Sequence, residues 1–170
     1  IGDTRITWGV AVDRLAVVML GLVTFVALVV QVYSVGYMRG DPRFGWYFAV
    51  HALFAAAMLA LVLADNLLFL YIAWELVGLG SYLLIGFWYE RRSAAEAAKK
   101  AFVTTRIGDV GLLIGILLLF KATGSFDLST IFHVAQQGGI GQATINASAF
   151  LIFLGAMGKS AQFPFHVWLP

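Results

Sequence analysis

Long apolar runs separated by short polar segments make up most of the chain. The runs cover residues 14–38, 44–64, 67–89, 100–121 and 145–169. At about 1.5 Å per residue in a helix, each is long enough to cross a hydrocarbon core of about 30 Å. Lipid cannot form hydrogen bonds with the N–H and C=O groups of irregular backbone, so each run is predicted to be a helix. The pattern predicts an all-α, polytopic transmembrane helical bundle with about five membrane-spanning helices in one transmembrane domain.

The longest polar segment, residues 122–142, contains glycines and is too broken to span a membrane. We predict that it lies at the membrane interface. Its middle, residues 128–137, is predicted to form a short helix with Ile131, Phe132 and Val134 toward lipid.

The composition agrees with a lipid environment. The chain is 61% hydrophobic and 12% charged, with a net charge of +2, whereas soluble domains carry about 25% charged residues. The basic residues form no stripe that would bind nucleic acid. The sequence has no cysteine, which excludes disulfides, zinc–thiolate sites and iron–sulfur ligation by thiolates. Any redox centre is therefore expected on another chain.

The two ends of the sequence suggest a fragment. The chain opens at Ile1 without an initiator Met and stops at Pro170, directly after apolar and aromatic residues. We interpret it as a piece of a longer protein. Residues 1–11 are mixed in character and are predicted to lead in outside the membrane.

Basic residues predict the orientation of the bundle. They concentrate in the loops after the first and third runs, residues 39–43 and 90–100. The positive-inside rule places such loops on the cytoplasmic side, or the matrix side in a mitochondrion. Aromatic residues near the same boundary fit an interfacial belt, although large side chains are common in membrane helices generally. These aromatic residues are Trp46, Tyr47, Phe87, Trp88 and Tyr89.

Two charges fall near the middle of predicted helices, Glu75 and Lys159. A charge at the bilayer centre costs several kcal/mol and usually marks an ion pathway. Helical spacing places Tyr71, Glu75, Gly78 and Tyr82 on one face. One interpretation is a proton relay in which Glu75 biases the proton affinity of Lys159. The other is a static ion pair that locks two helices together, and the residues alone leave both open.

Helical spacing also predicts that Lys159, Gln162 and His166 share one face of the last run. Pro164 removes one helical hydrogen bond and clashes with the carbonyl of Ser160. Broken helices at the midplane are where transporters bind ions. We therefore expect a helix break beside Lys159, with Gln162 and His166 as supporting polar groups.

The fourth run carries a second pair of opposite charges, Arg106 and Asp109, three residues apart. They are expected to pair along their own helix, although Arg106 could instead extend toward the interface. In the same run, Gly111 and Gly115 form a Gly-x-x-x-Gly step, which suggests close helix packing.

Several motifs resemble the antiporter-like membrane subunits of respiratory complex I, the chain L or subunit 5 family of NADH:quinone oxidoreductase. They contain Ala64-Asp65-Asn66, Trp74-Glu75, Arg106-Ile107-Gly108-Asp109 and Gly158-Lys159-Ser160-Ala161-Gln162-Phe163-Pro164, in that order. The resemblance implies a larger antiporter-like fold of two inverted repeats, of which this chain covers part.

The resemblance also implies a function and a location. Glu75 and Lys159 would form the central pair of a proton path, with Arg106 and Asp109 beside it and a discontinuous lysine helix at Pro164. The chain would lie in a bacterial cell membrane or the mitochondrial inner membrane, with other membrane subunits as partners, and would not work as an isolated monomer. NADH, FMN, iron–sulfur clusters and quinone would bind to other subunits. The alternatives are the large subunit of a multisubunit Na⁺/H⁺ antiporter and a structural membrane scaffold.

Overall fold

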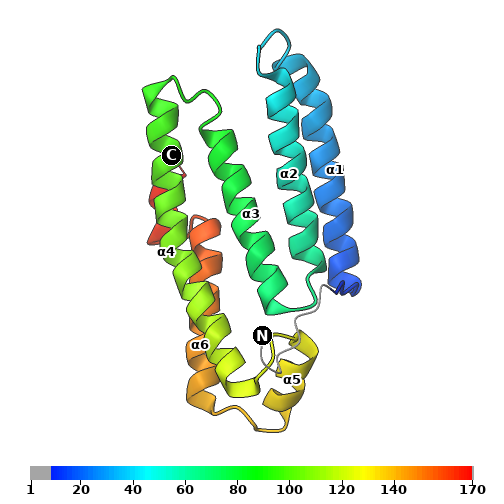
Figure 1. Cartoon of the computed structure of the whole chain (residues 1–170), viewed down its shortest axis with the longest axis vertical. Coiled ribbons are helices and arrows are strands. Elements are labelled where there is room, and N and C mark those ends of the chain that lie inside the picture. The colour runs from blue at the N-terminus through cyan, green and yellow to red at the C-terminus, as the bar shows by residue number, and fades with distance from the viewer. Residues whose placement is uncertain (1–8, 170) are drawn as a thin grey trace.

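The computed structural model describes residues 9–169, and all regular structure in this range is helical (Figure 1). The prediction of an all-α bundle is confirmed. Most of the predicted lead-in, residues 1–11, lies outside the described residues, as does Pro170. The elements are α1 (Arg14–Tyr37), α2 (Phe44–Leu63), α3 (Leu67–Ile85), α4 (Arg92–Thr123), α5 (Leu128–Gln136), α6 (Gln142–Lys159) and a 3-10 helix, η1 (Phe165–Trp168).

The helices α1 to α4 run up and down in alternation (Figure 1). The loops before α2 and before α4 lie at one end of the bundle, here called the loop end. The α2–α3 turn and α5 lie at the opposite end. The last helix, α6, packs along the half of α4 that is nearer to α5, and it stops at about the mid-height of α4 (Figure 1).

Side-chain caps explain where two of the spans begin. Asp13 precedes α1 and accepts a hydrogen bond from the backbone N–H of Ala16 at 2.7 Å. Asn66 precedes α3 and accepts one from the backbone N–H of Phe69 at 2.8 Å. Each cap satisfies a backbone donor that the first helical turn leaves unpaired. Asn66 also allows the tight turn between α2 and α3.

Four helices of the described chain are long and apolar enough to cross a membrane: α1, α2, α3 and α4. These four helices match the first four of the about five spans that were predicted. The predicted fifth span, residues 145–169, is interrupted, because α6 ends at Lys159. Its 18 residues begin with a polar stretch that holds Gln142, Thr144 and Asn146, which lowers its hydropathy.

Two further boundaries differ from the prediction. The third helix ends at Ile85 and not at residue 89, because Gly86 terminates it and the following residues turn. The fourth helix begins at Arg92 and not at residue 100. The charged segment before residue 100 is rich in alanine, glutamate and lysine, which are strong helix formers. Its Lys99 and Glu96 side chains also pair at 3.1 Å.

The short helix α5 confirms the predicted element, but two of the three side chains predicted to face lipid, Ile131 and Val134, pack inward. Ile131 is buried and packs in a cluster with Leu67, Leu112, Ile116 and Ile140. The prediction that Ile131 points toward lipid is therefore wrong, because α5 folds back against α3 and α4. Phe132, by contrast, is exposed as predicted.

Glycines bring α4 and α6 into close contact. A Cβ atom at Gly115 would lie 2.9 Å from the carbonyl oxygen of Ser148, and one at Gly111 would lie 2.9 Å from Leu154 Cδ2. The predicted Gly-x-x-x-Gly step is thus a packing surface. Gly108 extends this surface by one turn toward Lys159, because a Cβ there would lie 3.0 Å from the Leu154 carbonyl oxygen.

Polar and aromatic contacts join the two loops at the loop end. Arg43 pairs with Glu90 at 3.0 Å and lies over the rings of Phe87 and Tyr89. The indole N–H of Trp88 donates to the Asp41 carboxylate at 3.0 Å. These contacts fix the ends of α2 and α3 relative to each other. Part of the predicted aromatic belt is therefore a packed cluster.

Candidate functional site

Four charged side chains gather where α3, α4 and α6 meet. Glu75 comes from α3, Arg106 and Asp109 from α4, and Lys159 is the last residue of α6. The signs alternate along the row, from Glu75 to Arg106, Asp109 and Lys159, so that formal charges sum to zero. A balanced row is the form in which buried charges are tolerated, because each group has an opposite neighbour.

Arg106 lies between the two carboxylates. Its guanidinium forms an ion pair with Glu75, and its Nη1 atom lies 3.8 Å from Asp109 Oδ2. The pairing of Arg106 with Asp109 along α4 was predicted, and Arg106 also pairs with Glu75 across to α3. The guanidinium also stacks over the ring of Phe102, with 4.6 Å between the guanidinium carbon and the ring centroid.

Asp109 is the most deeply buried member of the row, with 1% of its side chain exposed. Its Oδ2 atom lies 3.5 Å from Lys159 Nζ. Its Oδ1 atom accepts a hydrogen bond of 2.6 Å from the indole N–H of Trp74. Asp109 thus connects the Glu75–Arg106 pair on one side to Lys159 on the other.

Glu75 and Lys159, predicted as the central pair, form no direct ion pair with each other among the described residues. Each of the two residues forms its ion pair with a residue of α4, Glu75 with Arg106 and Lys159 with Asp109. The sequence placed Glu75 and Lys159 near the midplane and paired Arg106 with Asp109 along one helix, but it could not rank partners across helices, because partner choice depends on how the three helices are rotated. Trp74 was also missed as a site residue, although it directly precedes Glu75.

Lys159 sits in a confined position. Its Nζ atom is buried and has no hydrogen-bond partner among the described residues, and it lies 5.9 Å from the centre of the Trp74 ring. A Cβ atom at Gly78 would collide with this ammonium group. The glycine in α3 therefore makes the space that Lys159 occupies.

The helix break beside Lys159 is present, as the sequence predicted. Helix α6 ends at this residue, and Ala161 adopts a positive φ of 50°. Beyond the break, the indole N–H of Trp168 donates to the carbonyl oxygen of Gly158 at 2.9 Å. That bond ties η1 back to the end of α6 and satisfies one carbonyl that the break leaves free.

The break also separates residues that were expected to share one face. Gln162 and His166 are both exposed, and the His166 ring stacks on Phe163. The expected face with Lys159 required a continuous helix, so its prediction fails where α6 ends. Pro164 lies beyond the break, at the start of η1. The structure therefore brings Glu75, Arg106, Asp109 and Lys159 together, but does not place Gln162 or His166 with them.

A cavity of about 190 Å³ adjoins the row on its α3–α4 side. Lys159, Gly78, Ser81 and Thr105 line part of it. The volume is enough for several water molecules, since one takes about 30 Å³ in the liquid. Among residues 9–169, no group of three or more His, Cys, Asp or Glu side chains could hold a metal ion.

The fold and the buried charges define an integral membrane protein of the polytopic helical class. Residues 64–170 match the family described as NADH:quinone oxidoreductase/Mrp antiporter, TM. Residues 1–48 match the family described as NADH-ubiquinone oxidoreductase (complex I), chain 5 N-terminus. The chain belongs to the NADH:quinone oxidoreductase/Mrp antiporter family, as the motifs indicated.

Named relatives agree with this membership. The chain is 51% identical to NAD(P)H-quinone oxidoreductase chain 5 of Synechocystis sp., over 99% of this chain and 25% of that protein. It is 50% identical to the chloroplastic subunit 5 of Anthoceros angustus, over 99% of this chain and 24% of that protein. The chain therefore spans about a quarter of the length of these relatives.

A solved structure has the same fold. The Mrp complex from Dietzia sp. contains a chain that superposes with a TM-score of 0.86 at 37% sequence identity. The match covers 95% of this chain and 18% of that chain. The Mrp complex thus contains a subunit that includes this helical arrangement.

Proposed function

We propose that this chain forms part of a proton-translocating, antiporter-like subunit of an NADH:quinone oxidoreductase of the complex I type. The row of Glu75, Arg106, Asp109 and Lys159 carries the proposal, because four charges of alternating sign inside membrane helices, one buried and three partly buried, are costly for a purely structural element. Each protonation change in such a row alters the electrostatic energy of its neighbours.

Arg106 is the proposed switch between the two halves of the row. It is within reach of both Glu75 and Asp109, with Asp109 Oδ2 3.8 Å from its Nη1 atom. When Lys159 carries its proton, Asp109 is balanced by Lys159, and Arg106 stays with Glu75. When Lys159 loses that proton, Asp109 attracts Arg106, and Glu75 is left to take up a proton. Glu75 and Lys159 are thereby coupled through α4.

Lys159 is the proposed proton donor and acceptor at the other end of the row. Its position at the end of α6 leaves it attached to a helix terminus, where a small change in backbone angle moves the ammonium group. Gly78 has no side chain and so makes the space that this ammonium group occupies. Discontinuous helices at the membrane midplane serve ion sites in transporters in the same way.

The driving force comes from outside this chain. The relatives named above are subunits of NAD(P)H-quinone oxidoreductases. We propose that NADH, FMN, iron–sulfur clusters and quinone are bound by other subunits, and that quinone reduction there drives the charge row here. Neighbouring membrane subunits are the proposed partners, and an isolated copy is expected to be inactive. The loop end, with its Arg and Lys residues, is proposed to face the cytoplasm, matrix or equivalent compartment.

An antiporter role is the second candidate. It is favoured by the likeness to the Mrp complex, at 37% identity and a TM-score of 0.86. In that role an ion gradient, and not NADH oxidation, would drive the same charge row. The match of residues 1–48 to complex I chain 5 favours the oxidoreductase. Proton uptake that follows NADH addition and persists without sodium supports the first candidate, and uptake that requires sodium supports the second.

Proton pumping by vesicles that carry the intact complex tests the proposal. Lys159→Met is expected to lower the number of protons pumped per NADH oxidised, with the complex still assembled on a native gel. Lys121→Met is the matched control, because Lys121 is exposed at the far end of α4. If Lys159→Met pumps like the control, the row is a structural scaffold and the proposal is wrong.

A further inference from the structure

Two cavities lie along α3, and residues of α2 and α4 also line each of them. The inner cavity, of about 190 Å³, contains Lys159 and Thr105 in its wall. The outer cavity, of about 490 Å³, lies at the loop end, and its wall includes Gly86, Ala98 and Lys99. Tyr82 alone lines both of them.

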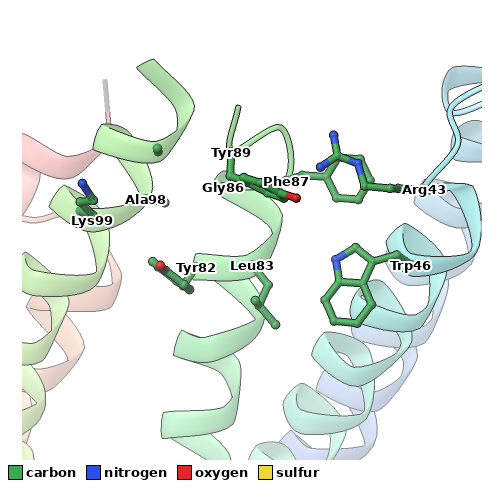
Figure 2. Close-up of a pocket in the computed structure, with 10 residues that line it drawn as sticks. Arg43, Trp46, Tyr82, Leu83, Gly86, Phe87, Tyr89, Ala98 and Lys99 are labelled. Carbon is green, nitrogen blue, oxygen red and sulfur yellow. The ribbon is translucent and has the colours of Figure 1, made fainter. Parts of the chain in front are cut away.

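Tyr82 stands at the boundary between the cavities. It lies one turn beyond Gly78 on α3 and one turn before Gly86, so that three residues on one helical face mark the inner cavity, the boundary and the outer cavity. Figure 2 shows the Tyr82 side chain pointing from α3 toward α4, where Ala98 and Lys99 lie. Its ring meets the ring of Phe102 edge to face, with the centroids 5.4 Å apart.

Small residues line α3 and α4 on either side of these two rings. Gly78 of α3 faces the Lys159 ammonium group, and a Cβ atom at Gly86, directly after α3, would lie 3.1 Å from that of Ala98 on α4. Ala101 lines the inner cavity. The bulky contact between Tyr82 and Phe102 is therefore the narrow place in an otherwise small-residue seam.

The outer cavity is accessible to water at its mouth. Arg43 and Lys99 lie there, and each is paired with an exposed glutamate of the loop end or of the first turns of α4. Charged side chains of this kind remain hydrated. The inner cavity contains an ammonium group, Lys159 Nζ, with no hydrogen-bond partner among the described residues. Water from the outer cavity would supply those partners.

We propose that the Tyr82–Phe102 ring pair is a gate that controls water access from the loop end to Lys159. This inference rests on the proposed function, since it provides the path by which Lys159 exchanges protons with the aqueous phase. Rotation of the Tyr82 side chain about χ1 joins the two cavities. Its hydroxyl group can donate and accept hydrogen bonds, so it is compatible with water in the open state. Tyr82 is a positioning residue for water and does not itself carry the charge.

Cysteine accessibility in the assembled complex tests the gate. Thr105→Cys places a thiol in the wall of the inner cavity, in a chain with no cysteine of its own. Its reaction rate with a charged, membrane-impermeant methanethiosulfonate is measured from the loop end, with other cysteines of the subunit replaced by serine. Tyr82→Ala in this background is expected to raise the rate by about tenfold or more, since a closed gate leaves the open state at a few per cent.

Two controls separate gating from general loosening of the fold. Tyr82→Phe retains the ring and is expected to leave the Thr105→Cys rate unchanged. Ile107→Cys lies two residues further along α4 and is 58% exposed on its outer surface, so its rate should not respond to Tyr82→Ala. If Tyr82→Ala does not assemble, Phe102→Ala removes the other ring and carries the same expectation.

Two results would overturn the gate. One is that Thr105→Cys reacts at the same rate with and without Tyr82→Ala. The other is that Thr105→Cys reacts in neither case. Labelling does not depend on pumping. If the proposed function is wrong, Lys159→Met pumps as well as the unmodified complex. If only the gate is wrong, the failure shows in the labelling rates alone.

Discussion

At the scale of single residues, Asp109 determines how the site is arranged. It is buried, accepts a hydrogen bond from Trp74, and lies between Arg106 and Lys159. The sequence identified Asp109 as a charge in a membrane helix but assigned it to a local pair with Arg106. Its contact with Lys159 depends on the packing of α6 against α4, which a spacing rule along one helix cannot provide. Trp74 was missed for the same reason.

A second carboxylate, Asp41 at the loop end, predicts a pH effect outside the membrane. Hydrogen bonds from Trp88 and from the Arg43 backbone N–H lower the pKa of Asp41 below its usual value of 3.8. The charged form thus stabilises the loop contacts above pH 3.8, and that contribution is lost as the pH falls through the lowered pKa. Trp88 fluorescence is expected to change in acid below pH 3.8. Asp41→Asn should remove this transition, and its persistence in that variant would assign it to another group.

At the scale of elements, hydrophobic patterning predicted the membrane helices well and the interruption of the last one only in part. Proline at position 164 correctly indicated a break. The break begins five residues earlier, at Lys159, because Ala161 turns the backbone and Trp168 holds η1 against α6. The prediction assumed that helical periodicity continues past Lys159, and it therefore wrongly placed Gln162 and His166 on the same face as Lys159.

The glycine contacts between α4 and α6 predict a stability effect. In Gly115→Val, the new Cβ atom would lie 2.9 Å from the carbonyl oxygen of Ser148. This overpacking is expected to destabilise the protein by about 1–3 kcal/mol. Gly21→Val is the matched control, since nothing lies within 4 Å of a Cβ there. The thermal inactivation midpoint of the detergent-solubilised complex should fall for Gly115→Val only. Equal midpoints would show that the two helices do not depend on this close approach.

At the scale of the whole molecule, the loops before α2 and before α4 lie together at one end of the bundle (Figure 1). This agrees with the expectation that both lie on one side of the membrane. Which side they face follows in our account from their basic residues. The charge row lies between the two ends, where α6 stops, and the two cavities that Tyr82 lines lead from it toward the loop end.

The orientation predicts different labelling at the two ends. Arg39 is exposed at the loop end and Gln137 is exposed beside α5, so each is replaced by cysteine in turn. An impermeant thiol reagent added outside intact cells is expected to label Gln137→Cys and to spare Arg39→Cys until the membrane is opened. The reverse pattern would place the basic loops outside and contradict the proposed orientation.

The central claim is that Glu75 and Lys159 are coupled through α4, and the most direct test is proton pumping by the complex with Asp109→Asn. Protons pumped per NADH are measured beside Glu75→Gln, Lys159→Met and the exposed control Glu96→Gln. The account predicts that Asp109→Asn loses pumping to the same extent as Glu75→Gln and Lys159→Met, while Glu96→Gln is unaffected. If Asp109→Asn pumps like Glu96→Gln while the other two fail, Glu75 and Lys159 act on each other directly and the row through Arg106 and Asp109 is not the path.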